Sequence, residues 1–211
     1  WRTPQGFGSL KKIVRLLRVR GVPSIVVLGF LGMFVQISLC YFLSSYVGGF
    51  PDAGGAGAFA LCMLYTGALI GRLVFVRLSH RIDACRIMAV YNAVALAGMA
   101  ALLLTQNLTA VCLLALLPGF GLSANFPGLM VRACGLMPED SATASALIFL
   151  GVNTAACAAP PLVGLVGDTA GLGAAFALCA ALLVPVIALS VWMSRQKTAS
   201  CPQEVQNAEQ L

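Results

Sequence analysis

The amino-acid sequence predicts an all-α polytopic membrane protein with six transmembrane helices, and three observations lead to this class. Of its 211 residues, 60% are hydrophobic and 9% are charged, whereas roughly 25% are charged in a typical soluble domain. The mean hydropathy is +0.94, so a single water-exposed globule could not cover its apolar residues. The apolar residues form continuous runs of about 20, the length that crosses a bilayer as a helix, and not the alternating strands of a barrel.

The six predicted spans follow one another with short connections. They lie at residues 22–47, 56–76, 87–105, 109–131, 142–166 and 172–193, and together they make a transmembrane bundle over residues 22–194. In the basic leader, residues 1–21, apolar side chains between Leu10 and Arg20 recur at helical spacing with basic side chains on the other face, which predicts either an interfacial helix or a basic linker that fixes the topology. Residues 195–211 are polar, and we expect a disordered tail.

Basic residues predict the orientation of the bundle, because Lys and Arg in short loops favour the cytoplasmic side. All thirteen basic residues lie before the first span, around the second connection, at the fourth connection or after the last span. The first, third and fifth connections contain none. We therefore expect an integral protein of the plasma (inner) membrane, with both termini in the cytoplasm and a lipid bilayer as its surroundings.

The six spans divide into two triplets, and because three is odd the second triplet enters the membrane from the opposite side. Inverted three-helix repeats of this kind are typical of secondary transporters. Helix-weakening residues interrupt the fourth span at Pro118, Gly119, Gly121 and Pro127, and the fifth is expected to end around Pro160, Pro161, Gly164 and Gly167. Gly67 and Gly71 form a GxxxG pattern that permits close helix packing.

Polar side chains at membrane depth are the candidates for solute binding, since they are costly in lipid and face the bundle interior or a wet cavity. Gln36 is the clearest, because it lies mid-span on a strip of small and polar residues. The full candidate set is Gln36, Ser44, Tyr65, Ser123, Asn125 and Asn153. The alternative for any one of them is a structural hydrogen bond between helices, which contributes about 0.6 kcal/mol.

Several chemistries are disfavoured by what the sequence lacks. No Asp or Glu lies at the middle of a span, so a coupling carboxylate is not in this segment. No CxxC or Cys/His pair supports a metal site, and no catalytic residue, cofactor or nucleic-acid partner is predicted. Uncharged amides favour a small neutral polar solute such as a sugar.

The connection between the second and third spans runs from Gly71 to Arg86 and resembles the cytoplasmic loop signature of the major facilitator superfamily. Leu78-Ser79 and Arg81 fit the pattern, whereas Val76, His80 and Asp83 replace its first Gly, its Asp and its second Gly. Three further segments are similar to helix entries or exits of the family: Leu17 to Val22, Ser123 to Pro127 and Pro160 to Asp168.

This resemblance implies the C-terminal six-helix half of a twelve-helix carrier that works by alternating access, with the N-terminal six-helix half as its missing partner. It would make Gln36 and Asn125 cavity residues, with Tyr65 and Asn153 beside them. It would also assign four residues to a cytoplasmic gate: Arg72, Arg81, Asp83 and Arg86.

Two other classes compete with the carrier. A self-contained six-span channel or permease subunit has the same span number, but the paired Asn-Pro-Ala turns of water channels are absent. An intramembrane hydrolase would need a histidine at membrane depth, and the single histidine, His80, lies in a predicted loop.

Overall fold

The computed structural model describes residues 21–136 and 141–195, and within them every regular element is a helix. The expectations for the leader before Gly21 and for the tail after Arg195 fall outside this part of the chain. The helices are α2 (Val22–Gly48), α3 (Ala56–Ser79), α4 (Ala84–Leu104), α5 (Leu108–Leu114), α6 (Leu116–Leu122), α7 (Asn125–Leu136), α8 (Ser141–Ala170) and α9 (Leu172–Arg195). Across the described ranges, six segments are long and apolar enough to cross a membrane, with α5 to α7 forming the fourth. The predicted fold class is confirmed.

Helix boundaries follow from local chemistry. Gly21 adopts φ 99° before α2, and Gly171 adopts φ 88° between α8 and α9, a left-handed conformation that glycine reaches without steric cost. Asn107 caps α5, where its side-chain oxygen accepts hydrogen bonds from the backbone N–H groups of Thr109 at 3.0 Å and Ala110 at 3.4 Å. This Asn cap starts the fourth span.

The fourth span is interrupted as predicted, since α6 ends at Leu122 and α7 starts at Asn125. The fifth span, expected over residues 142–166, is the single helix α8, which continues through Pro160 and Pro161 and ends at Ala170, a few residues later than expected. Ala155, Ala159 and Val163 on either side of them are fully buried against the core. Such packing can hold a helix together where proline removes backbone hydrogen bonds.

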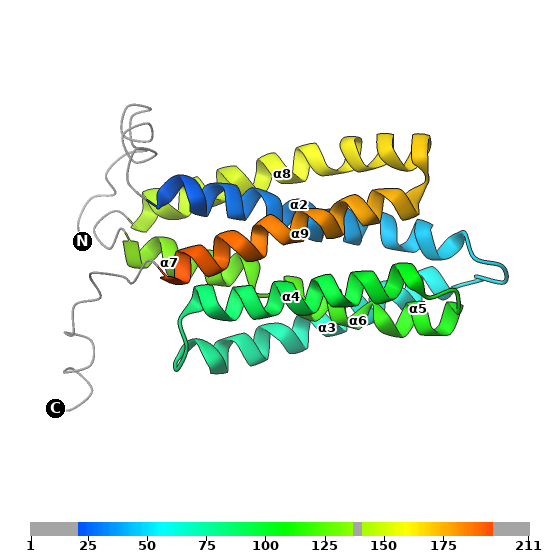
Figure 1. Ribbon diagram of the computed structural model, residues 1–211, viewed down its shortest axis with the longest axis horizontal. Coiled ribbons are helices and arrows are strands. Elements are labelled where there is room, and N and C mark those ends of the chain that lie inside the picture. Colours follow the sequence, from blue (N-terminus) through cyan, green and yellow to red (C-terminus); the bar gives the residue numbers. More distant parts are fainter. Residues whose placement is uncertain (1–20, 137–140, 196–211) are drawn as a thin grey trace, which may run out of the picture.

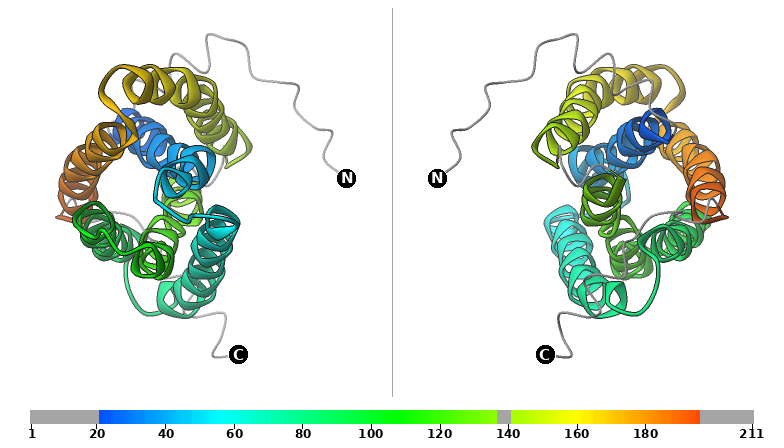
Figure 2. Two further views of the ribbon diagram at one scale, coloured as in Figure 1. Left: turned by 90° about the vertical axis from the view of Figure 1, so that its right-hand side faces the viewer. Right: turned by 90° about the vertical axis from the view of Figure 1, so that its left-hand side faces the viewer.

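The two helix triplets pack in an equivalent way. The first triplet is α2, α3 and α4, and the second is α5–α7, α8 and α9. The first helix of each triplet packs against the last two helices of the other: α2 against α8 and α9, and α6 against α3 and α4. The last helices, α4 and α9, pack along each other. Exchanging the triplets leaves this pattern unchanged, as an inverted repeat requires. Figure 2 shows α8, α9, α4 and α3 in an arc around α2 and the α5–α7 segment.

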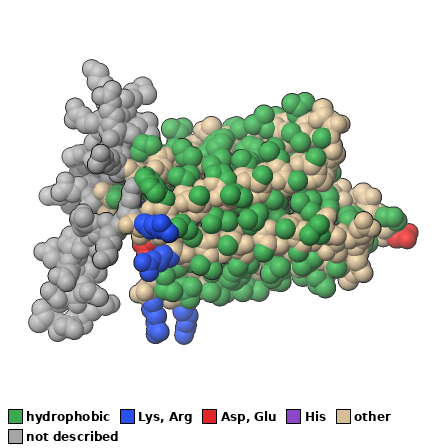
Figure 3. Space-filling view, viewed as in Figure 1, with side chains coloured by type: hydrophobic (Ala, Val, Ile, Leu, Met, Phe, Trp, Pro, Cys, Tyr) green, Lys and Arg blue, Asp and Glu red, His purple; other side chains and the backbone are tan. Residues whose placement is uncertain are grey.

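Both ends of the described chain and the α3–α4 connection lie at one end of the bundle, and the α2–α3, α4–α5 and α8–α9 connections lie at the other (Figure 1). Lys and Arg side chains gather at the first end, and hydrophobic side chains cover the body between the ends (Figure 3). Only 28% of the most apolar stretch of α3 is buried within the chain, against 56% for the α5–α7 span. Because so much apolar surface faces outward, the chain is an integral membrane protein.

Candidate solute site

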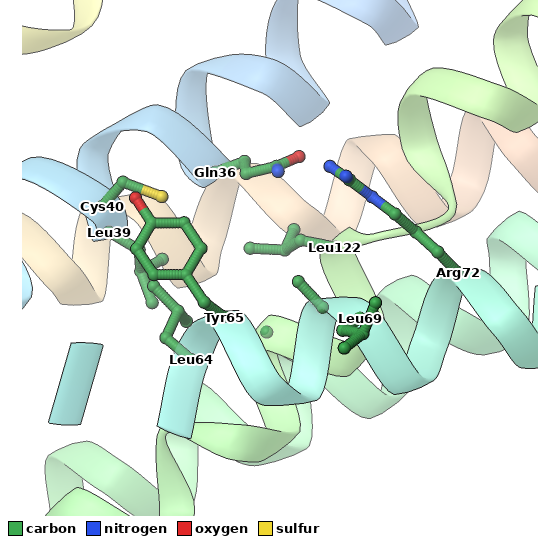
Figure 4. Close-up of a pocket in the computed structure, with 10 residues that line it drawn as sticks. Gln36, Leu39, Cys40, Leu64, Tyr65, Leu69, Arg72 and Leu122 are labelled. Carbon is green, nitrogen blue, oxygen red and sulfur yellow. The ribbon is translucent and has the colours of Figure 1, made fainter. Parts of the chain in front are cut away.

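A cavity opens between α2, α3 and α6, with a volume of about 180 Å³. Its wall is mostly aliphatic, and its polar groups come from α2 and α3 (Figure 4). The lining residues are Gln36, Leu39, Cys40, Leu64, Tyr65, Ala68, Leu69, Arg72, Gly119 and Leu122. Tyr65 is 58% exposed and Leu69 is 60% exposed, so the cavity opens onto a face that the chain's own helices leave uncovered.

Helical periodicity brings these side chains together. Gln36 and Cys40 are four residues apart in α2, and Tyr65, Leu69 and Arg72 are spaced by four and three residues in α3. Residues at these spacings lie on one face of a helix. The polar wall of the cavity therefore consists of one face of α2 and one face of α3.

Close packing beside the α2–α3 loop determines where the cavity begins. Gly57 lies so close to Ser44 that an added Cβ would be 2.9 Å from the Ser44 carbonyl oxygen. The cavity lies farther along both helices, and there Gly119 leaves room because it has no side chain. Ser44 is thus a contact between α2 and α3, outside the cavity.

Two polar pairs face each other in the cavity. Figure 4 shows the Gln36 amide and the Arg72 guanidinium group pointing toward one another from α2 and α3. The Tyr65 hydroxyl and the Cys40 thiol lie next to each other from the same two helices (Figure 4). Gln36, Tyr65 and Arg72 therefore offer an amide, a hydroxyl and a positive charge to one small volume.

Asn125 lies away from the cavity, in a buried amide pair. Its Nδ2 donates to Oδ1 of Asn92 at 3.2 Å, and Nδ2 of Asn92 donates to Oδ1 of Asn125 at 2.7 Å. The exposed fractions are 0% for Asn92 and 1% for Asn125. Gly32 of α2 makes room beside them, because a Cβ there would be 2.9 Å from Nδ2 of Asn125. This pair joins α4 to α7 where the fourth span is broken.

Ser123 and Asn153 also lie outside the cavity. Ser123 is buried, donates a hydrogen bond to the Phe120 carbonyl oxygen at 2.6 Å and packs against Gly71. Asn153 is exposed on α8, and its amide donates to the Phe149 carbonyl oxygen at 2.7 Å. Of the six residues expected to bind solute, the structure brings together only Gln36 and Tyr65.

The four residues expected at a cytoplasmic gate separate into two groups. Arg81, Asp83 and Arg86 are exposed at the α3–α4 connection. Arg72 lies within α3 and lines the cavity. Within the described ranges, none of these four side chains forms an ion pair.

Sequence reasoning did not single out Asn92 and did not place Arg72 at the cavity. Asn92 is an amide inside an apolar run, the same signal that drew attention to Asn125. Arg72 lies inside the predicted second span, but the family resemblance of the loop that follows it implied a place in the gate.

No protein-family model matches the chain, and no curated protein matches its sequence. The match to solved structures is clear. The E. coli fucose:proton symporter FucP superposes with a TM-score of 0.74 at 20% sequence identity, over 87% of this chain and 45% of the symporter. A second structure, described as a major facilitator superfamily transporter, FucP, in the outward conformation, gives 0.74 at 19% identity over the same shares. The chain has the fold of a major facilitator half.

A peptide transporter, POT, solved in complex with alafosfalin, supports the same conclusion. It superposes on this chain with a TM-score of 0.71 at 20% identity, over 90% of this chain and 43% of the transporter. The chain thus spans less than half the length of the transporters it matches.

Proposed function

We propose that this major facilitator half is one wall of a secondary transporter that moves a small polar solute by alternating access. In this proposal the cavity between α2, α3 and α6 is this half's share of the solute site. An N-terminal six-helix half forms the opposite wall. The basic end of the bundle faces the cytoplasm, as Lys and Arg in short connections favour.

One observation carries the proposal: polar groups from two transmembrane helices converge on a cavity that opens at an uncovered face. Gln36, Tyr65 and Arg72 are costly at membrane depth unless they face water, protein or a ligand. A cavity with an aliphatic wall and a few converging polar groups is typical of small-molecule sites. The fold similarity supports transport in general, and the sites named in FucP and POT structures belong to those proteins.

The α3–α4 connection is our proposed gate region at the cytoplasmic end. Arg81, Asp83 and Arg86 are exposed there, where they can pair with charges of the opposite half in one state and separate in the other. Four of the expected solute-binding residues are weaker candidates for contact with the solute, because they lie outside the cavity: Ser44, Ser123, Asn125 and Asn153.

Uptake by the full-length protein in proteoliposomes tests this function. The probes are a labelled hexose, a labelled neutral amino acid and a labelled small carboxylate. For a transported probe, we expect Gln36→Ala and Tyr65→Phe to weaken apparent affinity about fivefold each, the effect of one lost hydrogen bond of about 1 kcal/mol. Correctly folded protein that takes up none of the three classes would contradict the proposal.

Thr66→Ala is the matched control. Thr66 is exposed on α3 next to Tyr65, lies outside the cavity and donates its hydroxyl to the Cys62 carbonyl oxygen at 2.7 Å. We expect unchanged affinity. If Thr66→Ala weakens affinity as much as Gln36→Ala, the cavity is not the solute site.

A further inference from the structure

Arg72 is placed unusually for a residue that only fixes topology. It lies about two turns before the end of α3 at Ser79, or roughly 10 Å along the helix axis. Arg77 and Arg81 lie closer to the basic end and reach water more readily. An arginine at the depth of Arg72 is costly in the membrane and marks a functional position by default.

No carboxylate of the described chain neutralises this charge. The cavity lining contains no Asp or Glu, and Arg72 forms no ion pair with any described residue. The described carboxylates lie elsewhere: Asp52 in the α2–α3 loop, Asp83 before α4 and Asp168 near the end of α8. The cavity therefore has a positive charge that lacks a counter-charge from its own helices.

We propose that this cavity is an anion site, and that the transported solute carries a carboxylate held by Arg72 and Gln36. The assignment rests on the proposed function. The guanidinium group presents a planar fork of donors that matches a carboxylate. The Gln36 amide lies across the cavity from that fork, with its oxygen nearer Arg72 (Figure 4). Rotation about the last side-chain bond turns the NH2 group toward Arg72 instead, so an anion between them can accept hydrogen bonds from both side chains. This replaces the neutral solute expected from the amides alone.

The remaining lining residues indicate the chemistry of the part of the solute that is not the carboxylate. Leu64, Leu69 and Leu122 surround the polar groups with aliphatic surface. The volume of about 180 Å³ is this half's share of a site that is open at the uncovered face. The solute is therefore an organic acid with an apolar body, and the Tyr65 hydroxyl can bond a polar substituent on it.

The rate at which charged reagents modify the Cys40 thiol depends on the charge in the cavity and therefore measures it. Cys40 lines the cavity, so full-length protein with every other cysteine replaced by alanine reports from that position. We would compare its reaction rate with a negatively charged reagent, 2-sulfonatoethyl methanethiosulfonate, and a positively charged one, 2-(trimethylammonio)ethyl methanethiosulfonate. We expect Arg72→Gln to lower the negative-to-positive rate ratio about tenfold, because the positive charge attracts the negative reagent and repels the positive one, and two effects of roughly threefold multiply in the ratio. An unchanged ratio would show that a carboxylate outside the described residues already neutralises Arg72, and would overturn the proposal.

Protection by small ligands tests the carboxylate specifically and needs no Arg72 variant. Acetate should slow the modification of Cys40, whereas acetamide, which has the same shape without the charge, should not. Arg72→Lys retains the positive charge but not the planar fork of donors. The ratio of the Cys40 modification rates should therefore stay unchanged, while protection by acetate becomes weaker. Equal protection by acetate and acetamide would overturn the proposal.

Cys157 as the single cysteine is the matched control. It is exposed on α8 and lies outside the cavity, so its rate ratio should not depend on Arg72. The labelling readout is independent of uptake. Acetate protection without any uptake would refute the transport function and keep the anion site, whereas uptake restricted to neutral probes without acetate protection would refute the anion site alone.

Discussion

At the residue scale, burial and hydrogen-bond partners separate two roles for amides that look alike in the sequence. Asn125 and Gln36 are both amides inside apolar runs. Asn125 is 1% exposed and has its amide paired with Asn92, whereas the Gln36 amide points into a cavity (Figure 4). Composition and position along the chain cannot make this distinction, because it depends on which helix lies opposite.

The Asn92–Asn125 pair predicts a measurable coupling. Asn92→Ala and Asn125→Ala should each lower the free energy of unfolding by about 1 kcal/mol, because each leaves a buried amide without its partner. The double-mutant cycle should give a coupling energy of about 0.6 to 1.7 kcal/mol, the range measured for hydrogen bonds between membrane helices. Reversible unfolding in bicelles measures both quantities.

Asn153→Ala is the control for this cycle, since within the part of the chain that the structure describes the Asn153 amide donates only to a carbonyl of its own helix. We expect a stability change below about 0.5 kcal/mol for this exposed position. If Asn125→Ala instead weakens solute affinity with no loss of stability, Asn125 acts in solute binding and its structural role here is wrong.

At the element scale, glycines determine how closely the helices approach. Added Cβ atoms at Gly67 and Gly119 would overlap the backbone of Leu116 and Leu64 respectively, so α3 and α6 meet at backbone contact. The sequence predicted close packing from Gly67 and Gly71. It did not identify the partner helix, because a GxxxG pattern carries no information about the surface that it contacts.

Gly119→Ala should disrupt this contact. The new Cβ would meet the backbone of Leu64, which cannot move aside as a side-chain tip can. Overpacking of this kind costs about 1 to 3 kcal/mol, and a lower melting temperature in detergent measures it. Because Gly119 also lines the cavity, solute affinity should fall as well.

Gly164→Ala is the comparison in α8. A Cβ there would meet only the ring tip of Phe42 at 3.6 Å, an ordinary contact, and alanine is the better helix former. We expect an unchanged or slightly higher melting temperature. If both variants lose the same stability, the α3–α6 contact is not a tight one.

At the scale of the whole molecule, charge and topology give the bundle two unlike ends. Asp52 lies in the α2–α3 connection, at the end opposite the basic α3–α4 connection (Figures 1 and 3). On the face shown in Figure 3, the described Lys and Arg side chains gather at the end that also holds the ends of the described chain. This arrangement predicts which connections face the cytoplasm.

Cysteine accessibility in intact cells tests the orientation. With a membrane-impermeant maleimide, Asp52→Cys should be labelled from outside, and Arg81→Cys should be labelled only after the cells are permeabilised, as the positive-inside rule requires. Both positions are exposed, so lack of access cannot arise from burial within the chain. The reverse labelling pattern would show that the basic end faces outward.

The sequence by itself determined the membrane class, the six spans and the break in the fourth span. Apolar run length, charge position and the Pro and Gly residues act locally along the chain, so they can be read without a structure. Only the tertiary structure decided that Gln36 and Arg72 face one cavity while Asn125 pairs with Asn92. These relations join helices that are distant in the sequence, and they depend on how each helix is rotated about its axis. Because that rotation is set by packing against neighbouring helices, periodicity within one helix could not supply it.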